Sequence, residues 1–402
     1  MAQTYFQKGL GLRSEVRPQL RESYRSRIVD VMRLQGHRLT VGDLDFRLAR
    51  EFGFCYGVER AVQYAYETVR KFPDRRIYLT GEIIHNPHVN NELARKGIRF
   101  LGDGEDRYRD LRTDDVVLVP AFGVPRADLE ELSSRGCVVV DTTCGSVLNV
   151  WKNVERYASL GVTSIVHGKY EHEETRATFS RTTLHPGAHY LVVRSKDEAA
   201  EVCGYIAGGG SREAFLEHFS RSMSPDFDPD RHLERIGLAN QTTMLSSESL
   251  EIAEMFRQAL VARYGPDVPD RFIAFDTICS ATQDRQDAIR AMESDNLDIM
   301  IVIGGYNSSN TNNLARIASE FTRAFHIEDA SSILSAEEIR HKLPGRPEEV
   351  RTRGWLEPGP RTIGLTAGAS TPNNQIGAAI ERIVGFRDKM GVRTLGELLS
   401  RN

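Results

Sequence analysis

The sequence lacks the features of membrane proteins and of nucleic-acid-coating proteins. Its longest apolar run, Ile299–Ile303, is far shorter than the ~20 residues that cross a bilayer. Charge of one sign is not in excess, since the 402 residues carry a net charge of −4. A bulk nucleic-acid binder is usually strongly basic. We therefore expect no membrane and no nucleic-acid partner. With 40% hydrophobic and 27% charged residues, the chain reads as an ordinary globular protein of two or three domains.

Cysteine is scarce, and a targeting signal is not evident. The five cysteines are scattered and odd in number, which argues against a disulfide framework, and no Cys-x-x-Cys pair suggests a local zinc finger. No apolar core follows the first basic residue, Lys8, as a secretory signal requires. Residues 1–46 contain acidic side chains, which transit peptides avoid, so we expect a surface helix near residues 17–35. A cytoplasmic location is expected, or the plastid stroma if residues 1–46 are a transit peptide.

Three of the cysteines recur in a similar local setting. Cys55, Cys144 and Cys279 each follow a strand-like segment and precede a helical pattern. A polar cluster follows each of them at a near-constant distance: His85, His172 and Ser308 lie 30, 28 and 29 residues further on. The apolar runs before the last two clusters, 164–166 and 299–303, predict buried parallel strands.

A third cluster completes each repeat, at the end of an apolar stretch. The three clusters are Ala121–Val124, Asn240–Thr243 and Thr366–Ser370. The repeats predict three related α/β units, each of which presents its loops at strand ends, where α/β proteins bind ligands. Residues 204–235 are rich in glycine and proline and read as a surface insertion in the second unit.

These residue types suit a soft metal centre beside an anion site. Three thiolates from Cys55, Cys144 and Cys279 would hold an iron–sulfur cluster that keeps one iron without a protein thiolate. The alternative for any one of them is a buried packing cysteine, which is our interpretation of Cys137 and Cys203.

The polar clusters suggest phosphate or diphosphate binding. Short donors on loops near helix starts complete the anion cradle that backbone N–H groups begin. These donors are His85, His172, Ser308, Asn310 and Ser370. No Walker lysine loop or Gly-x-Gly-x-x-Gly motif points to a nucleotide. Helix capping is the alternative for 308–310.

A carboxylate next to an imidazole suits proton delivery, and Glu174 follows His172 by two residues. Thr242 either relays a proton or simply ends a strand. For the neighbours Glu171 and Glu173, a solvated charged loop is the better interpretation.

Taken together, these motifs resemble the 4-hydroxy-3-methylbut-2-enyl diphosphate reductase family, in its cyanobacterial and plastid branch. The resemblance runs from about residue 47 to 385. It is carried by eight motifs in order: 54–58 (FCYGV), 82–86 (EIIHN), 141–144 (DTTC), 172–175 (HEET), 241–243 (QTT), 276–279 (DTIC), 307–310 (NSSN) and 366–370 (TAGAS).

The resemblance implies a fold and a site. It implies three α/β domains in a trefoil arrangement around a central 4Fe–4S cluster, with a helical N-terminal extension. It implies Cys55, Cys144 and Cys279 as cluster ligands and Glu174 with Thr242 as the catalytic pair. The implied substrate-binding residues are His85, His172, Ser308, Ser309, Asn310 and Ser370. On the sequence we place the segments at 1–46 (extension), 47–140, 141–275 and 276–390 (three domains) and 391–402 (tail).

The resemblance also implies the reaction. The cluster's unique iron binds the substrate's allylic hydroxyl, and two electrons and two protons remove it as water. The products are isopentenyl and dimethylallyl diphosphate, in the last step of the methylerythritol phosphate pathway. The implied electron donor is ferredoxin or flavodoxin, and the expected state is a monomer or homodimer.

The sequence departs from the family at Phe122, where many bacterial members carry a second diphosphate-contacting histidine; His167 is a candidate to compensate. Gly145-Ser146 also replaces a proline-containing pair. Two readings from other classes stay open at this point. One is a non-catalytic iron–sulfur sensor or electron carrier, which would want four thiolates and no substrate cradle. The other is a zinc hydrolase.

Overall fold

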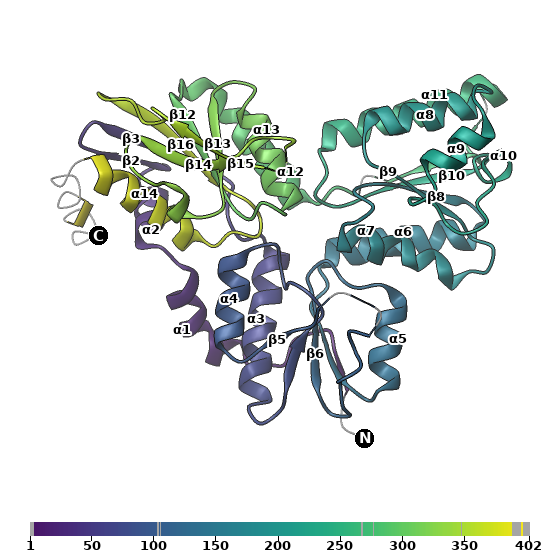
Figure 1. The fold of residues 1–402 in the computed structure, drawn as a ribbon, viewed down its shortest axis with the longest axis horizontal. Coiled ribbons are helices and arrows are strands. Elements are labelled where there is room, and N and C mark those ends of the chain that lie inside the picture. The colour runs from purple at the N-terminus through teal and green to yellow at the C-terminus, as the bar shows by residue number, and fades with distance from the viewer. Residues whose placement is uncertain are drawn as a thin grey trace. The chain divides into compact units, whose positions relative to one another are not determined.

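The computed structural model describes residues 4–102, 104, 106–266, 268–275, 277–346, 348–387 and 395–396. Asp276, and the predicted tail 391–402 apart from Leu395 and Gly396, lie outside these residues. The chain divides into two compact units. Unit 1 comprises 1–8, 74–81 and 99–279, and unit 2 comprises 9–73, 82–98 and 280–402. Figure 1 shows the fold as a ribbon. Within the described residues, no helix combines the length and apolar character that crossing a membrane requires.

Unit 1 contains two parallel sheets. The first has the strand order β1-β7-β6-β4-β5. Its strands are β1 (Tyr5–Phe6), β4 (Ile77–Leu79), β5 (Arg99–Phe100), β6 (Val116–Val119) and β7 (Val138–Asp141). Every residue of β6 and β7 is buried, as expected of parallel strands covered on both faces. Helix α5 (Arg126–Ser134) contacts β7.

The second sheet of unit 1 has the order β11-β10-β8-β9 and is also parallel. Its strands are β8 (Thr163–His167), β9 (Tyr190–Val193), β10 (Ile236–Asn240) and β11 (Phe272–Ala274). Its helices are α6 (Gly145–Ser159), α7 (Glu173–Phe179), η1 (Ser180–Leu184), α8 (Lys196–Ile206), α9 (Arg212–His218), α10 (Pro229–His232) and α11 (Ser246–Tyr264). All five residues of β8 are buried, which confirms the strand predicted at 164–166.

The insertion 204–235 is more than a surface loop. It forms α9 and α10, and it places Phe215, Phe219, Phe227 and Leu233 in the core of the second sheet. Its glycines and prolines lie at the ends of short helices, and the aromatic side chains of this segment pack into that core. The prediction of a surface excursion is therefore wrong for these four side chains.

Unit 2 is built on the third sheet, with the order β15-β14-β13-β12-β16-β3-β2. Its strands are β2 (Arg38–Val41), β3 (Leu44–Leu48), β12 (Ile299–Ile303), β13 (Arg323–Ile327), β14 (Glu338–Lys342), β15 (Glu349–Arg353) and β16 (Arg361–Ala367). The four central strands are parallel, and β2, β14 and β15 are antiparallel additions. β12 is buried throughout, as its apolar run predicts.

The N-terminal segment completes this third sheet. β3 pairs with β16, so a strand near the start of the chain lies beside a strand near its end (Figure 1, purple beside yellow-green). The helices of unit 2 are α1 (Arg13–Tyr24), α2 (Arg27–Leu34), α3 (Tyr56–Lys71), α4 (Pro87–Arg95), α12 (Ser280–Arg290), η2 (Ala291–Asp295), α13 (Ser309–Ala318), η3 (Ala330–Ser332) and α14 (Asn373–Arg387).

The single helix expected near residues 17–35 is two helices. Its chain leaves the helical conformation at Arg25, and the Ser26 side chain accepts a hydrogen bond from the Val29 N–H to begin α2. The sequence pattern continued across this break because both helices bury one apolar face.

Candidate active site

The three candidate ligand cysteines each stand at a helix N-terminus. Cys55 caps α3, Cys144 caps α6, and Cys279 immediately precedes α12. All three are partly buried. A helix N-terminus stabilises a thiolate, because its N–H dipoles favour negative charge. The donor set and its settings therefore fit a soft metal centre that takes thiolate ligands.

The backbone holds these cysteines in a repeated way. Each cysteine N–H donates to a carbonyl in the third cluster of a repeat: Cys144 to Ala121 at 2.8 Å, Cys55 to Ala369 at 3.1 Å and Cys279 to Thr242 at 3.4 Å. The strand before each cysteine lies in the same sheet as the strand before that cluster. Each sheet therefore ends in two adjacent loops, of which one carries a cysteine.

Arg285 braces the loop before Cys55. Its buried guanidinium donates to the Gly53 carbonyl from Nη2 at 2.7 Å and from Nε at 3.2 Å. Gly53 has a φ of +70°, which favours glycine. No sequence motif pointed to Arg285. The signal was available, because Thr282, Arg285 and Ile289 share the buried face of α12.

The other two cysteines pack in the interior, as their sequence setting predicts. Burial raises the pKa of the Cys203 thiol to about 12 and also raises the pKa of Cys137. A thiol whose pKa is raised in this way is a poor metal ligand and a poor nucleophile.

Glu174 and Thr242 form a buried pair in unit 1. The Glu174 side chain is 3% exposed, and its Oε1 accepts the Thr242 N–H at 2.6 Å. Its Oε2 accepts the Thr242 hydroxyl at 3.1 Å. Because the Thr242 carbonyl accepts the Cys279 N–H, one residue connects the carboxylate to a candidate ligand cysteine. We call Glu174 and Thr242 the acid pair.

Gln241 ties the loop of the acid pair to α7 and to the turn before it. Its Oε1 accepts the Lys169 N–H at 3.1 Å and the Thr175 hydroxyl at 3.2 Å. Gly168 lies so close that an added Cβ would stand 3.0 Å from the Gln241 Cβ. These contacts position the acid pair.

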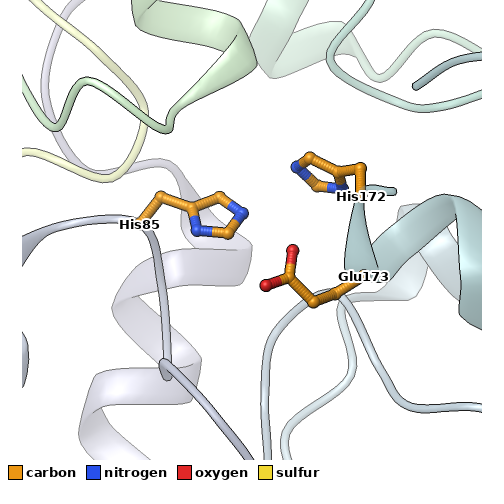
Figure 2. Close-up of side chains that lie close together, drawn as sticks. All are labelled: His85, His172 and Glu173. Atoms are coloured by element: carbon orange, nitrogen blue, oxygen red, sulfur yellow. The ribbon is translucent and has the colours of Figure 1, made fainter. Parts of the chain in front are cut away.

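His172 is the N-cap of α7. Its Nδ1 accepts the Glu174 N–H at 3.1 Å, so the proton of the neutral ring lies on Nε2, which is then a donor. Figure 2 shows the imidazole of His172 and the carboxylate of Glu173 at the start of α7. Glu173 is exposed, whereas Glu174 is buried. This difference supports the choice of Glu174 over its neighbour.

Phe122 occupies the loop after β6 and packs against His172. The ring centroids are 6.1 Å apart and the rings meet edge to face. Phe122 therefore positions the His172 ring. His167 does not compensate for a missing cation: it is fully buried, its Nδ1 hydrogen-bonds to Ser249 at 2.9 Å, and burial lowers its pKa to about 4.

The start of α13 in unit 2 collects buried short donors. Ser308 is the N-cap and accepts the Thr311 N–H at 3.2 Å, while Ser309 and Asn310 form the first turn. All are buried. The Asn310 Nδ2 has no hydrogen-bond partner among the described residues. A buried amide donor without a partner costs free energy, and at a helix N-terminus it suits an anion.

The loop after β16 completes this group. The Ala369 N–H donates to the Asn310 Oδ1 at 2.9 Å, and the Ser370 hydroxyl donates to the His85 carbonyl at 3.2 Å. Gly368 approaches α13 so closely that an added Cβ would stand 1.9 Å from the Thr311 hydroxyl. The contacts place His85, Ser308, Ser309, Asn310 and Ser370 in one group, which we call the anion cradle.

His85 lies in the loop before α4 (Figure 2). Its Nδ1 is 2.9 Å from the Glu82 carboxylate, which fixes the ring orientation. The buried Asn90 side chain accepts the Ile83 N–H and donates to the Ile84 carbonyl, so this loop is rigidly held. A carboxylate that orients an imidazole is typical of binding and catalytic histidines.

Lys342 and His326 lie beside the loop that leads into the cradle. The Lys342 ammonium donates to the Tyr306 carbonyl at 3.0 Å. The His326 Nε2 is 2.9 Å from the Gly304 carbonyl, and burial lowers its pKa to about 4, so His326 is neutral near pH 7. Lys342 is therefore the charged group of the two. Neither residue belongs to a motif that the sequence makes recognisable.

Comparison with known proteins identifies the class of protein. The sequence profile described as "LytB protein" matches residues 46–384. A 4-hydroxy-3-methylbut-2-enyl diphosphate reductase of Gloeobacter violaceus is 46% identical over 390 residues, covering 95% of this chain and 92% of the relative. The protein of that name from Thermosynechococcus vestitus is 45% identical, with 96% of each chain covered.

Solved structures agree. A structure of (E)-4-hydroxy-3-methyl-but-2-enyl diphosphate reductase aligns with a TM-score of 0.52 and 27% identity, covering 84% of this chain and 98% of that one. The E-1-hydroxy-2-methyl-but-2-enyl-4-diphosphate reductase of Plasmodium falciparum aligns with a TM-score of 0.61 and 21% identity, covering 83% and 86%, and it shares the fold.

The fold and the residue clusters thus define an α/β enzyme with three sheets. The chain belongs to the LytB family, whose members compared here are named 4-hydroxy-3-methylbut-2-enyl diphosphate reductases. This confirms the resemblance drawn from the eight motifs.

Proposed function

We propose that this enzyme removes the allylic hydroxyl of (E)-4-hydroxy-3-methylbut-2-enyl diphosphate by reduction. Two electrons and two protons enter, one C–O bond breaks, water leaves, and isopentenyl or dimethylallyl diphosphate remains. The observation that carries the proposal is the acid pair: the buried Glu174 carboxylate is linked through Thr242 to Cys279. Names of relatives at 45–46% identity support the substrate.

The cofactor that we propose is a 4Fe–4S cluster on Cys55, Cys144 and Cys279. Thiolates are the ligands such clusters take, and each cysteine stands at the positive end of a helix. When bound, a cluster held by three thiolates supplies single electrons and a Lewis-acidic iron. The Gln241, Arg285 and cysteine N–H contacts hold the loops that carry the ligands and the acid pair.

Glu174 is the proposed proton donor. Thr242 holds both carboxylate oxygens with its N–H and its hydroxyl, so the carboxyl group has one orientation. The hydroxyl can accept a proton as well as donate one, so Thr242 can pass a proton to Glu174 between turnovers. Burial excludes bulk water from the pair.

The diphosphate is the proposed guest of the anion cradle. The Asn310 Nδ2, the Ser308 hydroxyl and the first N–H groups of α13 are the donors that a diphosphate accepts from, and the Ser370 hydroxyl joins them when it turns away from the His85 carbonyl. His85 adds an imidazole, and His172 offers an Nε2–H donor from α7. We propose a ferredoxin- or flavodoxin-type protein as electron donor. The monomer or homodimer and the cytoplasmic location stay predictions.

Anaerobic turnover tests the proposal. The chain is purified without oxygen, its cluster is reconstituted, and the hydroxylated diphosphate is added with reduced methyl viologen. We expect both five-carbon diphosphates. Iron and sulfide without product would contradict the proposed reaction and favour an iron–sulfur sensor. Zinc in place of iron would contradict the proposed cofactor.

A further inference from the structure

An arginine stripe runs along α1, outside the site described above. Arg13, Arg17 and Arg21 follow one another at four-residue spacing, which places them on one face of the helix, and Arg25 directly follows the end of the helix. Like charges at this spacing destabilise a helix by about 0.2–0.5 kcal/mol per pair. Helix stability therefore does not explain the stripe.

The stripe lines a pocket of about 260 Å³ that Arg33 of α2 also lines. Within the described part of the chain, none of these five arginines has an ion-pair partner. Glu59 is the one acidic residue in the pocket lining. The pocket is therefore strongly positive, although the whole chain has a net charge of −4.

Other contacts of α1 hold the stripe in place. The Leu10 N–H, just before α1, donates to the buried Glu67 of α3 at 2.8 Å. The Tyr24 and Tyr66 hydroxyls are 3.2 Å apart, and Glu15 pairs with Arg70 at 3.0 Å. The N-terminal extension is thus fixed to the helix that Cys55 begins, and its arginines have an ordered base.

The pocket lining comes within one residue of Cys55. Phe54 lines it and directly precedes Cys55, and its ring lies 5.6 Å from that of Tyr24. Tyr56, directly after Cys55, is 80% exposed. Arginine and tyrosine are enriched among the residues that dominate binding energy at protein interfaces. An electron carrier seated here would stand close to a candidate cluster ligand.

We propose that this arginine pocket docks the acidic surface of a one-electron carrier protein. The inference rests on the proposed function, because it takes Cys55 as a cluster ligand. From Arg13 to Arg21 the stripe extends about 12 Å, at 1.5 Å per residue, and Arg25 continues it beyond the end of the helix. That length matches a patch on a protein surface rather than one phosphate group. Opposite charges raise the association rate and select the partner.

The test compares two electron donors on the reconstituted enzyme. In the variant Arg17→Glu/Arg21→Glu, we expect the KM for a reduced plant-type ferredoxin to rise about tenfold or more at low salt. Turnover with reduced methyl viologen should stay within about twofold of the wild type. The ferredoxin reaction of the wild type should weaken with salt, and that of the variant should weaken less. Arg17→Lys/Arg21→Lys should behave as the wild type.

Arg221→Glu is the control, since it makes half of the charge change of the double variant at an exposed arginine of unit 1. Unchanged ferredoxin kinetics in Arg17→Glu/Arg21→Glu, or an equal loss with both donors, would overturn the proposal. Ferredoxin binding by surface plasmon resonance separates this failure from that of the proposed function. If the wild type binds ferredoxin and the double variant does not, the result supports the docking pocket even without turnover. If the wild type does not bind ferredoxin, the result overturns the proposal.

Discussion

The acid pair and the anion cradle differ in whether the protein itself satisfies their hydrogen-bonding groups. In unit 1, both oxygens of the Glu174 carboxylate have hydrogen-bond donors from Thr242, so the protein itself completes the arrangement. In unit 2, the buried Asn310 amide keeps a donor without a partner among the described residues, although its Oδ1 is held by Ala369. The hydrogen bonds of the acid pair are therefore complete within the protein, whereas the anion cradle keeps a donor from which an anion can accept.

Because of this difference, the acid pair contributes to the rate of the reaction and the anion cradle contributes to substrate affinity. A carboxyl group that is already oriented has little reorganisation left when the reaction occurs, so it acts on kcat. A cradle with an unused buried donor gains a hydrogen bond only when the anion arrives, so it acts on affinity.

Glu174→Gln should have the largest effect. Glutamine keeps the shape and can accept the Thr242 N–H, but it cannot donate a carboxyl proton. Since general acid catalysis contributes about 10²–10⁴-fold, we expect kcat to fall by at least about 100-fold with little change in KM. Iron content and the visible spectrum should match the wild type. Glu173→Gln, the exposed neighbour, is the control and should keep full activity.

Asn310→Asp should weaken substrate binding by the anion cradle. Aspartate keeps the oxygen that accepts the Ala369 N–H and replaces the unpartnered donor with negative charge. We expect the KM for the diphosphate substrate to rise about 10–100-fold, the loss of one or two charge-assisted contacts. Asn153→Asp, on the exposed side of α6, makes the same chemical change away from the cradle. A larger change in kcat than in KM would count against the cradle.

Arg285→Met should loosen the loop before Cys55. It removes both hydrogen bonds to the Gly53 carbonyl and leaves a buried acceptor unpaired. The expected loss is about 1.5–3 kcal/mol of stability, seen as a lower melting temperature of the cluster-free chain. Cys55 should also react faster with iodoacetamide, by mass spectrometry, than Cys144. Arg285→Lys should lie between Met and the wild type. Equal melting temperatures and equal alkylation would argue against a bracing role.

Acid should destabilise both units by a smaller amount. The pKa values of His167 in unit 1 and His326 in unit 2 are about 4, below the ordinary 6.5. Below pH 6.5 these histidines therefore bind protons in the unfolded chain but not in the folded chain. Their contribution to the free energy of unfolding is complete above pH 6.5 and is lost as the pH falls towards 4. Each histidine contributes about 2 kcal/mol to the change between pH 7 and pH 5.

Urea unfolding of the wild type, His167→Asn and His326→Asn at the two pH values measures this effect. Each variant should lose part of the pH dependence, whatever its stability at pH 7. A variant that keeps the full pH dependence would show that its histidine titrates normally in the folded chain.

Much of the site is readable from the sequence because the motifs are local. The buried strands, the three strand-turn-cysteine-helix repeats and the cap at Ser308 each depend on a few adjacent residues. The pairing of β3 with β16 and the contact of Glu174 with Thr242 are long-range, and no local pattern specifies them. The role of Arg285 was not predicted, because a charged residue on a helix is usually exposed to solvent. Its hydrogen-bond acceptor also lies 232 residues away in the sequence.

The same limit explains the role of Phe122. The sequence showed only that a family histidine was absent. Its ring contact with His172 depends on how the first and second sheets of unit 1 meet at their loops. The insertion 204–235 was misread for a related reason, since its aromatic side chains pack on a core built from distant strands.

Calorimetric titration of inorganic diphosphate into the cluster-free chain tests whether the anion cradle, and not the acid pair, binds the anion. The wild type and Glu174→Gln should bind with the same Kd, and Asn310→Asp should bind about 10–100-fold more weakly. Equal weakening in Glu174→Gln and Asn310→Asp, or diphosphate binding that Asn310→Asp leaves unchanged, would contradict the assignment of anion binding to the cradle and of proton delivery to the acid pair.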